Sequence, residues 1–295
     1  MLKAIFFDWG STFVSEFKEV RKEIENLLEP HGLSWESFFP YWRNFYYLRS
    51  KGNIRNDEEM FLQEMPQIKF KLNKGLDKKV ANSFLFLKGG GIDFGKGIIK
   101  DHPKLGSLRN IKQREKRKKL ISDYIDNFYQ IHRPQLQNIA QKFNREWRKK
   151  EKEFFNSAAK IFKNYPWPKG KYIGYLSIFN CNPRNLEDKT FQIYYKHPAG
   201  VVYVTAHELL HFIFYDYFEK KFKKDFKKIS EEKIWKISEV FNSVLFFFRP
   251  LSKFTPNKVE KFDYPAFRKE IKRAKRVWKI SKDIDKLIST LLEIC

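Results

Sequence analysis

The stretch that most constrains the fold of this chain is AHELLHFIF, residues 206–214, an apolar run that carries His207, Glu208 and His211. The apolar residues around the histidines predict a helix that is buried in the protein. Two histidines at positions i and i+4 of a helix lie on one face, about 6 Å apart along the axis. Both imidazoles can therefore reach one metal ion, in the rigid and water-poor setting that such a site needs.

The spacing H-E-x-x-H also gives a role to the acid inside it. Glu208 follows His207 directly, which places its carboxylate near the metal but off the ligand face. There it can take a proton from a zinc-bound water, whose pKa the zinc lowers. We therefore predict His207 and His211 as ligands of Zn2+ and Glu208 as the catalytic general base. A chain with six histidines can also contain the motif by chance, so its surroundings must support it.

Two neighbouring segments support the motif. Residues 201–205, VVYVT, read as a β-strand that leads into the helix. Residues 234–246, IWKISEVFNSVLF, predict an apolar helix with one acid, Glu239, in its middle. A buried acid is unfavourable unless it is paired or bound to a metal. Catalytic zinc usually has three protein ligands, so we predict Glu239 as the third. The alternative is an acid on a helix face with a basic partner.

An H-E-L-L-H helix followed by a helix with a glutamate resembles the gluzincin class of zinc metallopeptidases, the thermolysin-like zincins, over roughly residues 120–295. The resemblance implies an α+β fold in which a small, mostly antiparallel sheet lies over the active-site helix. It also implies that the edge strand of this sheet pairs with an extended peptide or protein substrate, and that the activity is zinc-dependent hydrolysis of peptide bonds.

Two roles of that class have no clear holder in this sequence. The class often stabilises the oxyanion with a tyrosine or histidine from another segment, and four candidates stay open: Tyr215, Tyr217, Tyr264 and His197. The position four residues after the glutamate ligand, often an aspartate in the class, is Ser243 here, and Asn242 is the neighbouring alternative.

The beginning of the chain carries a second resemblance. AIFFDWGSTFV, residues 4–14, resembles the first motif of the haloacid dehalogenase-like hydrolases, in which a strand ends in D-x-D-x-T. Asp8 stands at the position of the nucleophile, but Gly10 replaces the second aspartate. The helical residues that follow resemble the cap insertion of that family, and residues 104–110 resemble its second motif, with Arg109 where Ser or Thr is expected. Without the later lysine and the acidic pair for magnesium, we expect this segment to be inactive.

Length and composition set the remaining expectations. A chain of 295 residues suggests about two domains, and we place a partial haloacid dehalogenase-like α/β segment with a helical cap-like insertion at 1–110 and the zincin-like domain at 111–295. The net charge of +24 favours an acidic partner, although dispersed lysines also fit a solvated surface; we do not expect a nucleic-acid partner. Two cysteines, no signal peptide and no long apolar run predict a soluble cytoplasmic protein without a transmembrane segment.

The sequence thus predicts a zinc-dependent metallopeptidase in which Glu208 is the general base. A second hypothesis is a binding or scaffold protein that keeps the zincin fold without turnover. A third is a magnesium-dependent phosphatase that uses Asp8.

Overall fold

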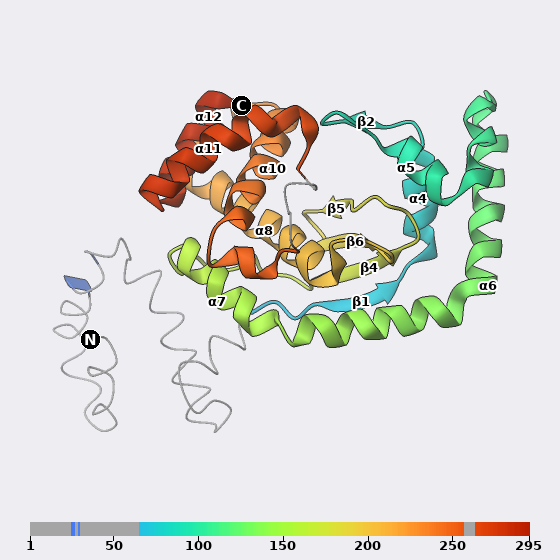
Figure 1. The fold of residues 1–295 in the computed structure, drawn as a ribbon, viewed down its shortest axis with the longest axis horizontal. Coiled ribbons are helices and arrows are strands. Elements are labelled where there is room, and N and C mark those ends of the chain that lie inside the picture. Colours follow the sequence, from blue (N-terminus) through green and yellow to red (C-terminus); the bar gives the residue numbers. More distant parts are fainter. Residues whose placement is uncertain (1–24, 27–28, 30–64, 257–262) are drawn as a thin grey trace, which may run out of the picture. The chain divides into compact units, whose positions relative to one another are not determined.

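The computed structural model describes residues 25–26, 29, 65–256 and 263–295 of the chain (Figure 1). The chain divides into two compact units, Met1–Glu64 and Met65–Cys295. Asp8, its loop and the helices expected before residue 65 lie outside the described residues. The expected boundary near residue 110 does not coincide with the observed division, because residues 65–110 belong to the same compact unit as the histidine motif.

A small mixed sheet lies at the centre of the second unit. Its strands are β1 (Lys69–Leu72), β4 (Ile173–Ser177), β6 (Thr190–Tyr194) and β5 (Arg184–Asn185), in the spatial order β1-β4-β6-β5. The pairings β1 with β4 and β4 with β6 are parallel, and only β5 with β6 is antiparallel. The coarse expectation of an α+β fold is confirmed, but the expectation of a mostly antiparallel sheet is wrong. A long helical connection between β1 and β4 permits the parallel pairing, which a tight turn does not.

Gly174 in the middle of β4 lets two aromatic rings meet on one face of the sheet. It lies opposite Phe70 of β1 and Phe191 of β6, whose ring centroids are 6.2 Å apart in an edge-to-face arrangement. A Cβ at position 174 would come within 2.5 Å of the Phe70 ring. The aromatic side chains thus fill the space that a larger residue would need.

Helix α4 (Lys74–Phe84) follows β1 and carries a buried acid, Asp77. Its carboxylate accepts hydrogen bonds from Ser177 Oγ at 2.6 Å, Tyr129 Oη at 2.6 Å, Gln192 Nε2 at 3.2 Å and the Ile178 N–H at 3.3 Å. Burial raises the pKa of Asp77 to about 6, although the four hydrogen bonds act in the opposite direction. The network joins α4 to the carboxyl end of β4, to β6 and to the long helix that follows.

The glycine-rich residues after α4 form a hairpin and a helix. The hairpin consists of β2 (Lys88–Gly89) and β3 (Ile92–Asp93), and α5 (Phe94–Asp101) follows directly. The expectation of short strands is confirmed, but α5 was not predicted because its two glycines disfavour a helix. Two short 3-10 helices, Pro103–Leu105 and Ser107–Asn110, contain the segment that resembles the second haloacid dehalogenase motif.

Helix α6 (Arg114–Arg148) runs beside the sheet and changes direction along its length (Figure 1). Pro134 lies inside this helix, where it removes one backbone donor and favours a kink. Near its end, Asn144 accepts a hydrogen bond from the Phe70 N–H at 3.0 Å and donates one to the Phe70 carbonyl at 3.2 Å. The Asn144 amide thus pairs with the backbone N–H and C=O of Phe70 at the outer edge of β1, where no other described strand binds them. Helix α7 (Glu151–Ile161) continues the helical region, as predicted.

The histidine motif lies on α8 (Gly200–Lys221), a long and largely buried helix. The predicted strand at 201–205 is wrong, because VVYVT forms the first turns of this helix. Val201, Tyr203 and Val204 are all less than 9% exposed. Burial of these β-branched and aromatic residues against neighbouring helices outweighs their weak intrinsic preference for strands.

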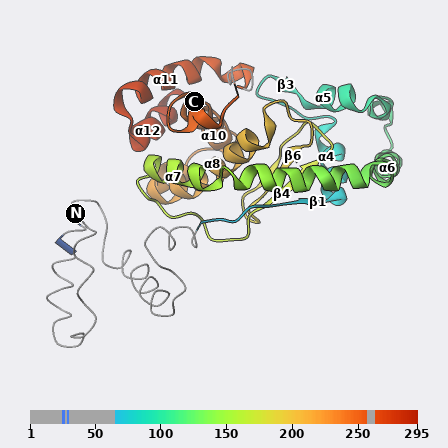
Figure 2. The same cartoon turned by 60° about the horizontal axis from the view of Figure 1, so that its bottom comes forward.

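The short helix α9 (Lys223–Phe226) follows α8. Helices α10 (Glu231–Phe247), α11 (Arg268–Ser281) and α12 (Ile284–Ile294) pack together at one end of the unit, opposite α5 and the beginning of α6 (Figure 2). Ser230 caps α10 by accepting a hydrogen bond from the Lys233 N–H at 3.2 Å. The predicted helix after residue 231 and the two predicted C-terminal helices are confirmed. Among the described helices, none has the length and apolar character required to cross a lipid bilayer.

Candidate metal centre

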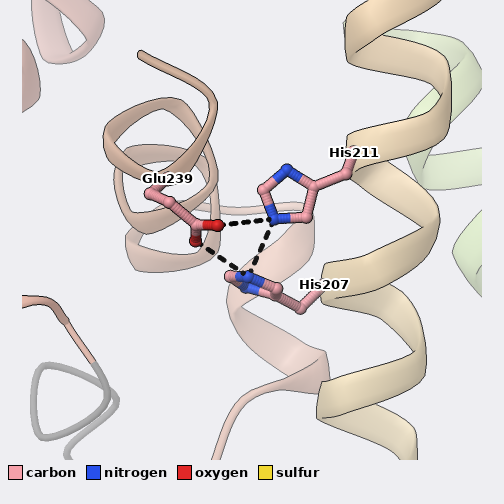
Figure 3. Close-up of side chains that lie close together, drawn as sticks. All are labelled: His207, His211 and Glu239. Carbon is pink, nitrogen blue, oxygen red and sulfur yellow. Dashed lines mark hydrogen bonds and ion pairs between the residues drawn. The ribbon is translucent and has the colours of Figure 1, made fainter. Parts of the chain in front are cut away.

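Three side chains from two packed helices converge at one point (Figure 3). His207 and His211 extend from α8 and Glu239 extends from α10. The two Nε2 atoms lie 3.0 Å apart, Glu239 Oε2 lies 3.3 Å from His207 Nε2, and Glu239 Oε1 lies 3.4 Å from His211 Nε2. The structure therefore brings together the three residues that the sequence singled out as metal ligands.

The spacing of these atoms fits a small tetrahedral ion. Zinc binds histidine nitrogen and carboxylate oxygen at roughly 2.0–2.1 Å, and a tetrahedron of that size puts its corners about 3.3 Å apart. The observed separations of 3.0 to 3.4 Å agree with this value. Unprotonated imidazole nitrogen and carboxylate oxygen both present lone pairs, so their convergence is favourable only with a proton or a cation between them. The donor set thus fits a divalent metal ion.

Burial differs across the centre and defines its open side. The side chain of His211 is fully buried and that of Glu239 is 4% exposed, whereas that of His207 is 19% exposed. Burial lowers the pKa of His211 to about 3, with Arg184 acting in the same direction and Glu239 against it. Burial alone would raise the pKa of Glu239, but the His211 and Arg184 side chains outweigh it and hold that pKa well below its usual range.

Arg184 is part of the centre and was not predicted. It lies on the edge strand β5, and its guanidinium contacts Glu239 Oε1 at 2.9 Å through Nη2 and Glu208 Oε2 at 3.3 Å through Nη1. The two buried acids in apolar helices implied a cation nearby, but 59 lysines and arginines gave no way to choose it. Glu239 thus faces the two histidines and also has a basic partner, which is the arrangement that the second sequence-based alternative describes.

Glu208 lies beside the three convergent residues but is not one of them. Glu208 is 3% exposed, and within the described residues it forms an ion pair with Arg184. Burial raises the pKa of Glu208, while Arg184 and His207 act against this rise. Glu208 follows His207 on α8 and thus joins the buried charged groups around the three convergent residues through Arg184.

The outer contacts of the two imidazoles depart from the usual pattern of zinc sites. Metal-bound histidines usually donate their second ring N–H to a carboxylate, carbonyl or water. Within the described residues, the Nδ1 atoms of His207 and His211 are buried and have no protein hydrogen-bond partner. Asn242, one of the two expected supporting residues, instead donates a hydrogen bond of 2.9 Å to the main-chain carbonyl of His207. It therefore supports the backbone of the ligand rather than its ring.

The four candidates for oxyanion stabilisation differ in whether they interact with the groups of the candidate metal centre. Tyr217 donates its hydroxyl to Asp285 and is turned away from the centre. Tyr264 interacts electrostatically with Glu239, Arg184 and Glu208. Its pKa is raised, mainly by burial and to a smaller extent by the negative charge of Glu239. Two others also lie close: Tyr215, which interacts with Arg184, and His197, whose pKa burial and His207 lower to about 4.

A cavity of about 210 Å³ borders the strand that carries Arg184. It is lined by α4 on one side and by the residues of β5 and β6 on the other, among them Leu76, Val80, Phe84, Pro183, Arg184 and Asn185. Arg184 thus belongs both to the wall of this cavity and to the candidate metal centre.

Comparisons with known proteins found no matching family model, no matching curated protein and no matching solved structure.

Proposed function

We propose that His207, His211 and Glu239 bind a zinc ion and that the chain is a zinc-dependent peptidase. The observation that carries this proposal is the set of separations of 3.0 to 3.4 Å among the three donor groups of α8 and α10. Two neutral imidazoles and one carboxylate are a common donor set for catalytic zinc, which keeps its fourth position open. The partial exposure of His207 marks the side from which a substrate reaches the centre.

The surrounding residues support hydrolysis rather than a purely structural role for the metal. Bound zinc supplies a water of lowered pKa and polarises a carbonyl group. Glu208 would accept the proton of that water, and burial raises its pKa, which favours proton acceptance. Tyr264 is the candidate to donate a hydrogen bond to the developing oxyanion. The cavity beside β5 offers space for an apolar side chain of the substrate.

Metal analysis of the purified full-length chain tests the first half of this proposal. We expect about one zinc per chain, loss of zinc in His207→Ala and His211→Ala, and retention of zinc in Glu208→Gln. A protein without stoichiometric zinc, and with the same metal content in His207→Ala, would contradict it. Hydrolysis of an unfolded protein substrate tests the second half, and we expect Glu208→Gln to lose activity while it keeps its zinc.

A second candidate function is zinc binding without turnover. The observation that favours it is the ion pair of Glu208 with Arg184, because a general base held by a buried cation is less able to accept a proton. In that case the wild-type chain binds zinc, cleaves no unfolded substrate and shows no change of function in Glu208→Gln.

A further inference from the structure

Arg184 brings a full positive charge into the candidate metal centre from a different part of the fold. The edge strand β5 holds its backbone, and its side chain is only 13% exposed. A guanidinium is always charged in proteins, and this one contacts Glu239 Oε1 at 2.9 Å and Glu208 Oε2 at 3.3 Å. One cation is thus shared between two buried carboxylates.

The charges of the centre do not balance without a cation. Glu208 and Glu239 are both buried, and Arg184 is the cation that contacts both of them in the described residues. Removing one partner from a buried ion pair is strongly destabilising, because the remaining charge is then desolvated without compensation. In the metal-free protein, Arg184 therefore supplies part of the positive charge that a metal ion would otherwise supply to the two buried carboxylates.

The Glu239 carboxylate contacts the Arg184 guanidinium and also faces the proposed position of the metal ion. Glu239 Oε1 lies 2.9 Å from Arg184 Nη2 and 3.4 Å from His211 Nε2. A divalent ion held by His207, His211 and Glu239 would lie within a few ångströms of the guanidinium, and like charges at that separation repel strongly in a buried setting. The single negative charge of Glu239 cannot fully compensate both the guanidinium and the metal ion.

We propose that Arg184 is the internal counter-ion of the metal-free centre and that the guanidinium and the metal ion compete for Glu239. The inference rests on the proposed function, since it takes His207, His211 and Glu239 as the ligands. Two consequences follow. The centre keeps its shape without metal, so the ion can enter and leave a folded protein. Metal binding also weakens the contact of Arg184 with Glu239 and leaves the guanidinium paired with Glu208.

Neutral substitutions of Arg184 in the full chain test this competition. We expect Arg184→Met and Arg184→Gln to bind zinc at least tenfold more tightly than the wild type, measured by competition with a chromophoric chelator. We also expect the Tm of each metal-free variant to fall by about 10 °C, because two buried carboxylates then lack their partner. With zinc bound, the loss of Tm should be much smaller, since the metal supplies the missing positive charge.

Two further variants separate charge from packing. Arg184→Lys keeps the positive charge, so we expect its zinc affinity to stay within about threefold of the wild type. Asn185→Ala alters the neighbouring residue of the same strand and should change neither zinc affinity nor the dependence of Tm on zinc. If the neutral variants bind zinc no more tightly than the wild type, and lose the same Tm with and without zinc, the competition is refuted while the metal site stands. If the wild type itself binds no zinc, the proposed function fails first.

Discussion

Asn242 on α10 donates a hydrogen bond of 2.9 Å to the main-chain carbonyl of His207 on α8. The amide is fully buried, and its Oδ1 has no hydrogen-bond partner among the described residues. Asn242 is three residues from Glu239, so this bond fixes the position of Glu239 relative to the helix that carries His207 and His211. A contact of this kind sets the geometry of the candidate site from outside its three convergent side chains.

We therefore expect Asn242→Ala to weaken zinc binding by about tenfold, as loss of a supporting hydrogen bond does in other metal sites. The free energy of unfolding of the metal-free protein should fall by about 1 to 2 kcal/mol. Chelator competition and urea unfolding measure the two effects. Ser243→Ala, at the next position, is the matched control and should leave zinc affinity unchanged. Equal zinc affinity in Asn242→Ala and the wild type would show that packing alone holds the two helices in place.

Zinc removal should lower stability by an amount set by mass action. A ligand present at 100 times its dissociation constant stabilises the folded state by about 2.7 kcal/mol. We expect the Tm of the wild type to fall on treatment with a chelator and to recover when zinc is restored. His211→Ala should show no such response, because it lacks a ligand. A zinc-dependent Tm in that variant would mean that zinc binds elsewhere.

Asp77 should make stability depend on pH in a direction that can be derived. Its pKa is about 6 in the folded protein and 3.8 in an exposed reference. A raised folded pKa means that the folded state binds the proton more tightly, so the contribution to stability is full below pH 3.8 and is lost as the pH rises through 6. Relative to Asp77→Asn, the wild type should gain about 1 kcal/mol of unfolding free energy between pH 7 and pH 5. Urea unfolding at both pH values measures this difference, and the absence of a gain would mean that Asp77 stays ionised in the folded protein over this range.

Gly90 in the β2–β3 hairpin should be intolerant of a side chain. Its φ is +59°, and a Cβ there would come within 2.3 Å of the Tyr264 ring. We expect Gly90→Ala to lower the free energy of unfolding by about 2 kcal/mol, since it adds backbone strain to the steric conflict. If Tyr264 contributes to turnover, the same substitution should lower kcat more than it changes KM.

The matched control for that substitution is Gly97→Ala. Gly97 lies inside α5, and a Cβ there would have no neighbour within 4 Å. Alanine should therefore stabilise the helix by about 1 kcal/mol. If both variants lose stability to the same extent, the conflict with Tyr264 is not the cause.

Local patterns predicted much of the region around the candidate site. The i, i+4 spacing placed His207 and His211 on one helix face, and the apolar helix around Glu239 indicated a buried acid that needs a partner. The helix after residue 231 and the two C-terminal helices also follow from local sequence. The prediction failed for VVYVT, where β-branched residues suggested a strand and burial on all sides produced a helix.

Local sequence predicts which side chains share a face of each helix, because a helical face repeats every 3.6 residues and depends on near neighbours alone. Only the tertiary structure decided that β1 pairs with β4 in parallel, that α10 brings Glu239 to the histidines, and that Arg184 reaches both acids. Arg184 is 24 residues from Glu208 and 55 residues from Glu239 along the chain. Contacts across such separations depend on how the sheet and helices pack together, and no local pattern records that arrangement.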